Sequence, residues 1–252
     1  MMLAGYGMYF LRYLLPRLPS RGRVLSISRM SLPWDLESLI QFLDDCEIPY
    51  DRGAVPYVGA RRDRLTTAEL FRLLGFAHYD DIDFDPAEGT TLLHDLNVSI
   101  PLDWHQGYDL VFENGTLEYI FDIKQAIGNI AHLVKVGGYV CHASPLDAFN
   151  HGFYNFSPNF FHDFYDANGF TDLHFYLVRY SSKYATHQSV HVDEIAYTHK
   201  EIYFDPSIYD GPLDKAYVGC LARKATHCPE TRVPIQGAYD PRKRLPNRLK
   251  TH

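Results

Sequence analysis

Short apolar segments that end in polar residues alternate along this chain with segments of helical periodicity. Apolar runs of roughly four to eight residues are typical of strands buried on both faces, and the stretches between them place apolar residues on one side of a helix. The alternation predicts right-handed βαβ units, and therefore a mostly parallel sheet with helices on both faces. The predicted strands are 24–28, 78–84, 91–97, 108–114, 138–143, 173–180 and 216–224.

The intervening segments predict five helices. Thr66 and Glu69 form a capping-box pattern at the start of one of them, and Gly137-Gly138 is expected to end the longest. Residues 46–64 hold two prolines and two glycines without a period, so they predict a surface loop. The predicted helices are 6–15, part of 31–45, 66–74, 116–135 and 157–169.

The last two predicted strands have no clear helix between them, which predicts an antiparallel hairpin at one edge of a mixed sheet. The 35 residues at 181–215 that separate them are long enough to predict an insertion that closes over the site. We expect one domain over 1–252, with an N-terminal helix within 1–20 that acts as a lid or a packing element. A basic tail is expected at 240–252.

Composition and charge exclude several classes of protein. An apolar fraction of 46% with 22% charged residues predicts a packed core, and no window approaches 18 uncharged apolar residues, so no membrane span is expected. The net charge of −7 repels polyphosphate, so nucleic acid is not an expected partner. The 4 cysteines form no CxxC pair, which favours reduced packing thiols and a cytoplasmic protein. The sequence leaves the oligomeric state open.

Polar residues gather where the predicted strands end, which is where open α/β sheets bind their ligands. Asp83 ends the second strand, where an acidic residue either holds a ribose diol or is simply solvated. Asp95 either accepts from an adenine amino group or is an ordinary loop residue. Glu113, Asn114 and Gly115 either let a cofactor approach or form an ordinary turn before the long helix.

The segment NHGFYNF follows another strand end and brings Asn150, His151 and Tyr154 toward the same crevice. His151 there is a candidate base for a hydroxyl, and the alternative is a histidine that hydrogen-bonds its own loop. A metal site built from His142, His151 and His162 lacks any compact ligand spacing, so no metal is expected.

Six strings in this chain resemble those of the class I S-adenosylmethionine-dependent methyltransferases, in particular bacterial small-molecule and glycan-pathway members. The resemblance covers roughly residues 22–180, and both the order and the spacing of the strings contribute to it. The strings are VLSISR, DIDFDPAEG, TLLHDLN, DLVFENGTLEYIFD, NIAHLVKVGGYV and HGFYNFSPNFFHDFYDANGF.

The resemblance implies a Rossmann-like α/β fold with a seven-stranded, mostly parallel sheet whose last strand is antiparallel. It implies S-adenosyl-L-methionine as cofactor and methyl transfer, here expected to be O-methylation, to a small molecule such as a sugar or natural-product intermediate. By position, Asp83 would hold the ribose, while Asp95 and Leu96 would hold the adenine. The methionine part would lie near Ser28, Arg29, Glu113, Asn114 and Gly115.

In this interpretation His151 is the catalytic base, Glu118 or Tyr119 orients the acceptor, and Asn150 and Tyr154 contact it. Two departures stand out: Ser28 follows the first strand where the family has a glycine-rich turn, and Tyr119 stands where many relatives have histidine. They keep open the alternative of a catalytically inactive or repurposed methyltransferase-like binding protein. A nicotinamide-dependent oxidoreductase ranks third, because no GxGxxG string follows the first strand.

Overall fold

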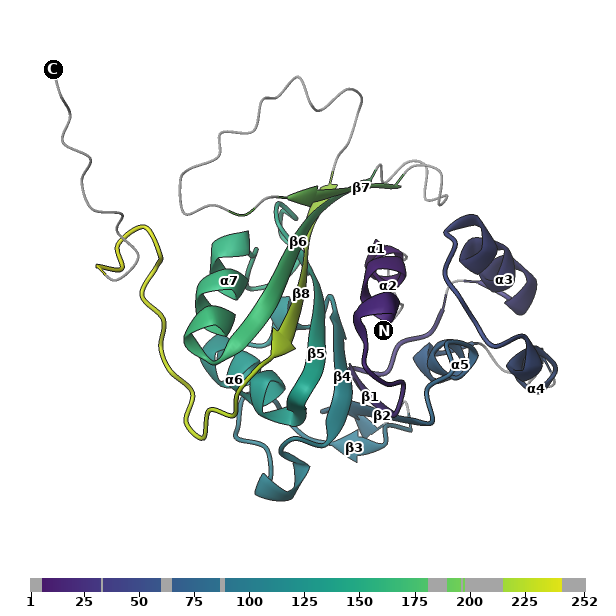
Figure 1. Ribbon diagram of the computed structural model, residues 1–252, viewed down its shortest axis with the longest axis horizontal. Helices are drawn as coiled ribbons and strands as arrows, with labels where there is room; N and C mark the ends of the chain where they lie inside the picture. The colour runs from purple at the N-terminus through teal and green to yellow at the C-terminus, as the bar shows by residue number, and fades with distance from the viewer. Residues whose placement is uncertain are drawn as a thin grey trace, which may run out of the picture.

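The computed structural model describes residues 6–32, 34–59, 65–86, 89–180, 190–195, 197 and 215–241. Within this part of the chain, eight strands form one sheet in the order β3-β2-β1-β4-β5-β8-β6-β7 (Figure 1). The strands are β1 Arg23–Ile27, β2 His78–Asp83, β3 Leu92–Leu93, β4 Tyr108–Asn114, β5 Val134–Pro145, β6 Phe170–Tyr180, β7 Val190–Ile195 and β8 Lys215–Lys224.

The central strands run parallel, as the sequence predicts. β1 pairs with β2 and β4, and β4 pairs with β5, all in parallel register. The predicted antiparallel last strand is confirmed, since β8 runs antiparallel to both β5 and β6. The prediction that this pair forms the edge of the sheet is wrong, because β8 lies between β5 and β6 while β7 pairs with the outer side of β6.

The sheet therefore has eight strands among the described residues instead of seven. The additional strand, β7, comes from the segment 181–215 that the sequence predicts as an insertion. The rest of that segment, apart from Tyr197 and Lys215, lies outside the described residues, as does the predicted basic tail from residue 242 on.

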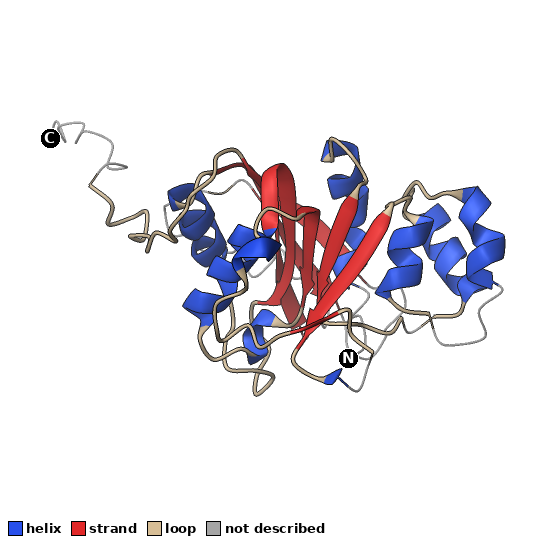
Figure 2. Cartoon of the chain, turned by 90° about the horizontal axis from the view of Figure 1, so that it is seen from below, coloured by secondary structure: helices blue, strands red, loops and turns tan. Residues whose placement is uncertain are grey.

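Helices cover both faces of the sheet (Figure 2). Alternate residues of the central strands enter two apolar cores, with Leu110 and Phe112 in one and Val111 and Val140 in the other. Burial on both faces explains why these strands are nearly continuous apolar runs. The first core is covered by α1 Tyr6–Tyr9, α2 Leu11–Leu14, α3 Leu36–Asp45, α4 Val55–Gly59 and α5 Thr67–Leu73, and the second by α6 Ile123–Leu133 and α7 Pro158–Ala167 (Figure 1).

The predicted starts of two helices are confirmed. Thr66 and Glu69 form the capping box of α5, and α7 begins at Pro158 directly after Ser157. At the start of α3, Asp35 accepts a hydrogen bond of 2.9 Å from the backbone N–H of Ser38.

The predicted helix 116–135 is shorter at both ends. A 3₁₀ turn at Leu117–Tyr119 precedes it, and Asp122 caps α6 by accepting from the backbone N–H of Gln125. At the other end Val134 is already extended, and the buried Lys224 ammonium donates to the carbonyls of Ala131 and Val134 at 2.7 and 2.8 Å. Lys224 thus satisfies carbonyls at the end of the helix, and the two glycines belong to β5 instead of ending α6.

Two further predictions are wrong in detail. The predicted strand 91–97 contains only β3, because the Asp95 carboxylate accepts from the backbone N–H of Asn97 and turns the chain. The predicted loop 46–64 contains α4 and a 3₁₀ turn at Arg52–Ala54, since Val58 is buried in the core; residues 60–64 lie outside the described residues.

The predicted N-terminal helix is divided into α1, α2 and a 3₁₀ turn at Leu15–Arg17, and its described part is a packing element. Phe10 and Leu11 are fully buried. The ring of Phe10 occupies the space where a Cβ of Gly219 on β8 would lie. The absence of a side chain at Gly219 therefore lets the N-terminal segment pack against the sheet.

The four cysteines are free and buried. Among the described residues, no helix is long and apolar enough to cross a membrane.

Replacing Gly219 tests this packing. Gly219→Ala is expected to lower the free energy of unfolding by about 1–3 kcal/mol, because the new methyl group overlaps the Phe10 ring. Chemical denaturation measures the loss. The double variant Phe10→Leu/Gly219→Ala should lose less than the sum of the two single variants, and strict additivity would contradict the contact.

Candidate functional site

The strand order reverses at β1 and β4, and such a reversal creates a crevice above the C-terminal ends of the strands. A cavity of about 470 Å³ opens at this end of β1 and β2, against the loops that follow β3 and β4. Four predicted cofactor-binding residues meet there, as does Tyr119 from the predicted catalytic group. The lining residues are Ile27, Ser28, Ile82, Asp83, Phe84, Asp85, His94, Asp95, Leu96, Asn97, Thr116, Tyr119 and Ile120.

Ser28 adopts the backbone conformation for which glycine is normally used. Its φ is 67°, in the left-handed region, and its backbone N–H donates to the carbonyl of Ile82 at 2.8 Å. The hydroxyl of Ser26 in turn donates to the Ser28 carbonyl at 2.9 Å. The turn after β1 therefore keeps a left-handed residue although the expected glycine is missing, and Ser28 bears the steric cost.

Ser28→Gly should relieve this cost. We expect the free energy of unfolding to rise by about 0.5–1 kcal/mol, because glycine adopts the left-handed conformation without a Cβ clash. Denaturation of the variant measures the gain. Ser31→Gly, three residues on and without a positive φ, serves as control and should lose stability; a gain there, or none at Ser28, would contradict the assignment.

The cavity lining is acidic. Asp83, Asp85 and Asp95 line it, and the described residues that line it include neither arginine nor lysine. Within the described part of the chain, the Asp83 carboxylate accepts a single hydrogen bond, a long one of 3.2 Å from the backbone N–H of Asp85. At Asp95, the backbone N–H of Asn97 donates at 2.9 Å and lowers the pKa of this carboxyl. Three carboxylates, with His94 as the one basic side chain among the described lining residues, favour a ligand with positive charge or with several hydroxyl donors.

Arg29 directly follows the lining residue Ser28 in the sequence, but it is not itself among the lining residues of the cavity. Its guanidinium lies 3.5 Å from the buried carboxylate of Asp81 and donates to the carbonyl of Gly89 at 2.5 Å. Arg29, a predicted cofactor-binding residue, thus forms an internal ion pair and a hydrogen bond that tie the turn after β1 to β2 and the β2–β3 connection.

Glu113 is also used internally. Its fully buried carboxylate accepts hydrogen bonds at 2.7 to 3.2 Å from the backbone N–H groups of Thr116 and Leu117, from Ser144 and from His142. Since a carboxylate only accepts, His142 donates through Nδ1, and its Nε2 forms a hydrogen bond of 2.6 Å with the Tyr165 hydroxyl. Glu113 thus fixes the turn after β4 instead of lining the cavity.

Asn114 and Gly115 do not line the cavity either. Asn114 is buried and packs against Gly7 of α1, where any Cβ would overlap its side chain. Gly115 has a φ of 76° and forms the turn after β4, as the ordinary-turn interpretation predicts.

The three predicted catalytic residues meet at one point beside the cavity. The Tyr119 hydroxyl lies 3.0 Å from Nε2 of His151, and the same nitrogen lies 3.5 Å from Oε1 of Glu118. His151 is part exposed and Glu118 is fully buried. Gly152 permits this approach, because its Cβ would lie 2.7 Å from the Glu118 carbonyl. Position 152 therefore requires glycine because of close packing and not because of a left-handed backbone conformation. In this segment the residue with a positive φ is Asn150, at 54°.

The two predicted substrate residues flank this group. Asn150 is exposed, and Tyr154 is half-buried with its hydroxyl donating to the Phe121 carbonyl at 2.8 Å. The segment 150–154 is thereby held against the loop that follows β4.

Glu118 is an unusual carboxyl. Both of its oxygens are buried and neither has a hydrogen-bond partner among the described residues. Burial, and then the charge of Glu113, raise the pKa of Glu118 to about 8. Perturbed carboxyls of this kind cluster at functional sites, and this one lies directly beside the candidate base.

The raised pKa of Glu118 has a measurable consequence. The unfolded chain releases this proton near pH 4.5 and the folded chain near pH 8, so the free energy of unfolding falls as pH rises through this window. Glu118→Gln cannot ionise. Its stability relative to the parent should therefore increase by at least about 1 kcal/mol from pH 5 to pH 8 in denaturant titrations. The exposed Glu37→Gln should show no such trend; equal trends would refute the raised pKa.

The three histidines considered as metal ligands do not converge. His142 contacts Glu113 and Tyr165, His151 contacts Tyr119, and His162 contacts Asp163. In the described part of the chain, no group of three or more potential ligands is arranged to hold a metal ion.

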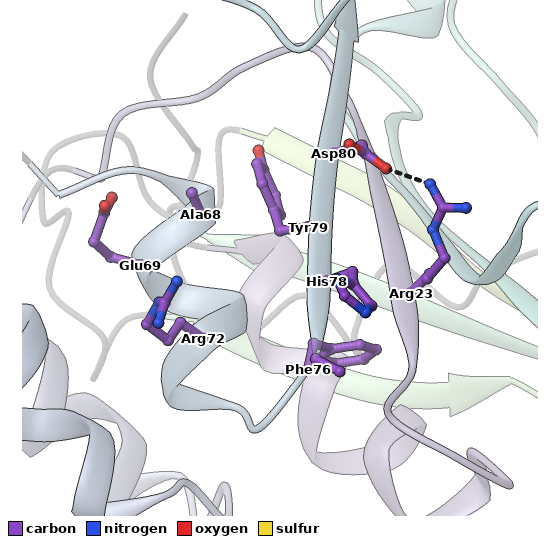
Figure 3. Close-up of a pocket in the computed structure, with 9 residues that line it drawn as sticks. Arg23, Ala68, Glu69, Arg72, Phe76, His78, Tyr79 and Asp80 are labelled. Atoms are coloured by element: carbon purple, nitrogen blue, oxygen red, sulfur yellow. Dashed lines mark hydrogen bonds and ion pairs between the residues drawn. The ribbon is translucent and has the colours of Figure 1, made fainter.

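A second cavity, of about 530 Å³, lies between α5 and the first half of β2, away from the strand ends (Figure 3). Its charged side chains are engaged: Arg23 donates to Asp80 at 2.9 Å, and Arg72 lies over the Tyr57 ring. Figure 3 shows Arg23 directed toward Asp80 across the strand. This cavity lacks the strand-end position expected for a cofactor site.

Sequence reasoning missed eight of the lining residues. A usable signal existed for most of them, because they directly precede or follow a residue already singled out at a strand end. They are Ile27, Ile82, Phe84, Asp85, His94, Asn97, Thr116 and Ile120.

No family model matches this chain, and no curated protein matches it. Among solved structures it is similar to a possible histamine N-methyltransferase from Thermotoga maritima, at 14% identity, a TM-score of 0.44, and coverage of 86% of this chain and 89% of that one.

Two further solved structures show a similar likeness. One is the 1,6-didemethyltoxoflavin-N1-methyltransferase of Burkholderia thailandensis with bound S-adenosylhomocysteine, at 11% identity, a TM-score of 0.46, and coverage of 88% and 80%. The other is an S-adenosylmethionine-dependent methyltransferase from Archaeoglobus fulgidus, at 11% identity, a TM-score of 0.46, and coverage of 87% and 93%. Likeness at this level assigns neither substrate nor activity.

Proposed function

We propose that this protein is an S-adenosylmethionine-dependent methyltransferase acting on a small molecule. The observation that carries the proposal is the acidic cavity at the C-terminal ends of β1 and β2, whose described lining residues include three aspartates and neither arginine nor lysine. S-adenosylmethionine supplies a methyl group on a positively charged sulfur, and such a cation suits an acidic cavity.

The acidic lining of the cavity also disfavours the alternative of a nicotinamide-dependent oxidoreductase. A dinucleotide carries a pyrophosphate, which α/β folds normally bind at the N-terminus of a helix after a glycine-rich turn. Here three aspartates line the cavity, and Arg29, the residue after the turn at Ser28, is paired with Asp81. A phosphorylated cofactor would meet repulsion without a compensating contact.

The chain's own residues suggest how the cofactor is held. Asp83 is the acceptor for the ribose hydroxyls, since among the described residues its carboxylate accepts a single, long hydrogen bond. Asp95 and Leu96 flank the adenine, and the turn at Ser28 lies beside the methionine part. All four residues line the same cavity, which supports this assignment.

For an acceptor hydroxyl, the geometry favours a proton route through two residues. Tyr119 lines the cavity, whereas His151 lies behind it at 3.0 Å from the tyrosine hydroxyl. The acceptor proton would pass to the Tyr119 oxygen while the Tyr119 proton passes to His151. Glu118, beside His151, would act as a positioning residue.

Removing the ribose acceptor tests the cofactor assignment. Asp83→Ala should weaken S-adenosylmethionine binding about thirtyfold, because a charged hydrogen bond is worth about 2 kcal/mol. Isothermal titration calorimetry measures the affinity. Asp103→Ala, an exposed aspartate outside the cavity, should bind like the parent. Equal affinities for the parent and Asp83→Ala would refute the assignment.

The base is tested separately. His151→Ala should lower kcat for a methylated hydroxyl acceptor at least about a hundredfold and leave cofactor affinity nearly intact. Normal turnover would remove His151 from the mechanism, and joint loss of cofactor binding and stability would make it structural. Cofactor binding by the parent without transfer to any acceptor would favour the inactive binding protein instead.

A further inference from the structure

Phe121 and Phe153 form a pair of exposed aromatic rings near the candidate site. They are 70% and 63% exposed, and their ring centroids lie 5.4 Å apart with the rings nearly perpendicular, at 88°. A single exposed phenylalanine is common on protein surfaces. Two rings that hold each other edge to face form a preoriented apolar surface, which suits a planar ligand.

The backbones of Phe121 and Phe153 are held close to residues of the candidate site. Phe121 follows Ile120, which lines the cavity, and the next residue, Asp122, donates its N–H at 2.9 Å to the side chain of Asn97, another lining residue. The N–H of Phe153 donates to the Glu118 carbonyl at 2.7 Å. The backbones of Phe121 and Phe153 therefore lie next to residues of the cavity and of the group formed by Glu118, Tyr119 and His151, although neither ring is among the lining residues of the cavity.

The negative charge of the cavity limits the chemical class of the acceptor further. The three cavity aspartates would repel an acceptor with a phosphate or carboxylate group. A sugar presents hydroxyl groups over most of its surface and would cover the two phenylalanine rings poorly. An uncharged aromatic ring covers them and can place a hydroxyl substituent toward the polar side chains nearby.

We propose that the methyl acceptor is an uncharged, planar aromatic compound with a ring hydroxyl, held by Phe121 and Phe153 with its hydroxyl directed at Tyr119 and His151. This inference rests on the proposed function and deepens it by naming the acceptor class. It replaces the sugar that the resemblance leaves open with a phenol-like compound.

The test uses 2-naphthol as probe and follows its fluorescence with and without saturating S-adenosylhomocysteine. The Kd of 2-decalol, the saturated counterpart, is measured from its displacement of 2-naphthol. The parent should bind 2-naphthol at least about tenfold more tightly than 2-decalol. Phe121→Ala and Phe153→Ala should each raise the Kd for 2-naphthol at least about fivefold. Phe149→Ala, which removes a ring that is 99% exposed in the neighbouring loop, is the matched control and should bind like the parent.

The outcomes separate this inference from the function on which it rests. Cofactor binding without 2-naphthol binding would overturn the aromatic acceptor and leave the methyltransferase proposal standing. Equal losses in all three phenylalanine variants would overturn it as well, since binding would then be nonspecific. The protein could instead self-associate in a concentration-dependent way. If Phe121→Ala or Phe153→Ala abolishes that association, the rings bind another copy of the chain and the aromatic acceptor is overturned. Absence of cofactor binding would refute the proposed function itself.

Discussion

The buried carboxylate of Glu113 organises the C-terminal edge of the sheet. It accepts four hydrogen bonds from the turn after β4 and from β5, and through His142 it reaches the Tyr165 hydroxyl on α7. A buried carboxylate is tolerated only when such bonds compensate its lost hydration, so the arrangement is strongly constrained. The turn that Glu113 holds leads directly to Glu118 and Tyr119. The position of the candidate catalytic group therefore depends on a residue that does not line the cavity.

Elements that local sequence determines are the ones that the sequence predicts well. The central strands are continuous apolar runs because both faces are buried, and the capping pattern at Thr66 marks the start of α5. The end of α6 could not be predicted in the same way. It depends on Lys224, which lies 90 residues beyond Val134 in the chain and donates to its carbonyl. The position of β8 inside the sheet likewise depends on long-range pairing with both β5 and β6.

The candidate site shows the same division. Ser28, Asp83 and Asp95 could be singled out because they follow predicted strands, and strand ends converge in a sheet of this topology. The internal role of Glu113 could not be predicted from the sequence, since its hydrogen-bond partners include residues about 30 positions away. Ser28 is instructive for a different reason: its missing glycine suggests a degenerate turn, yet the backbone keeps the left-handed conformation at a steric cost. The residue type at position 28 thus suggested that the turn geometry is lost, whereas the structure keeps it.

The proposed function requires that the acidic cavity at the ends of β1 and β2 bind the adenosyl cofactor. A crystal structure of the protein grown with S-adenosylhomocysteine would locate the binding site. We expect the ribose hydroxyls within hydrogen-bond distance of the Asp83 carboxylate and the adenine against Leu96. Ligand density in the cavity between α5 and β2, or no bound ligand at saturating concentration, would contradict it.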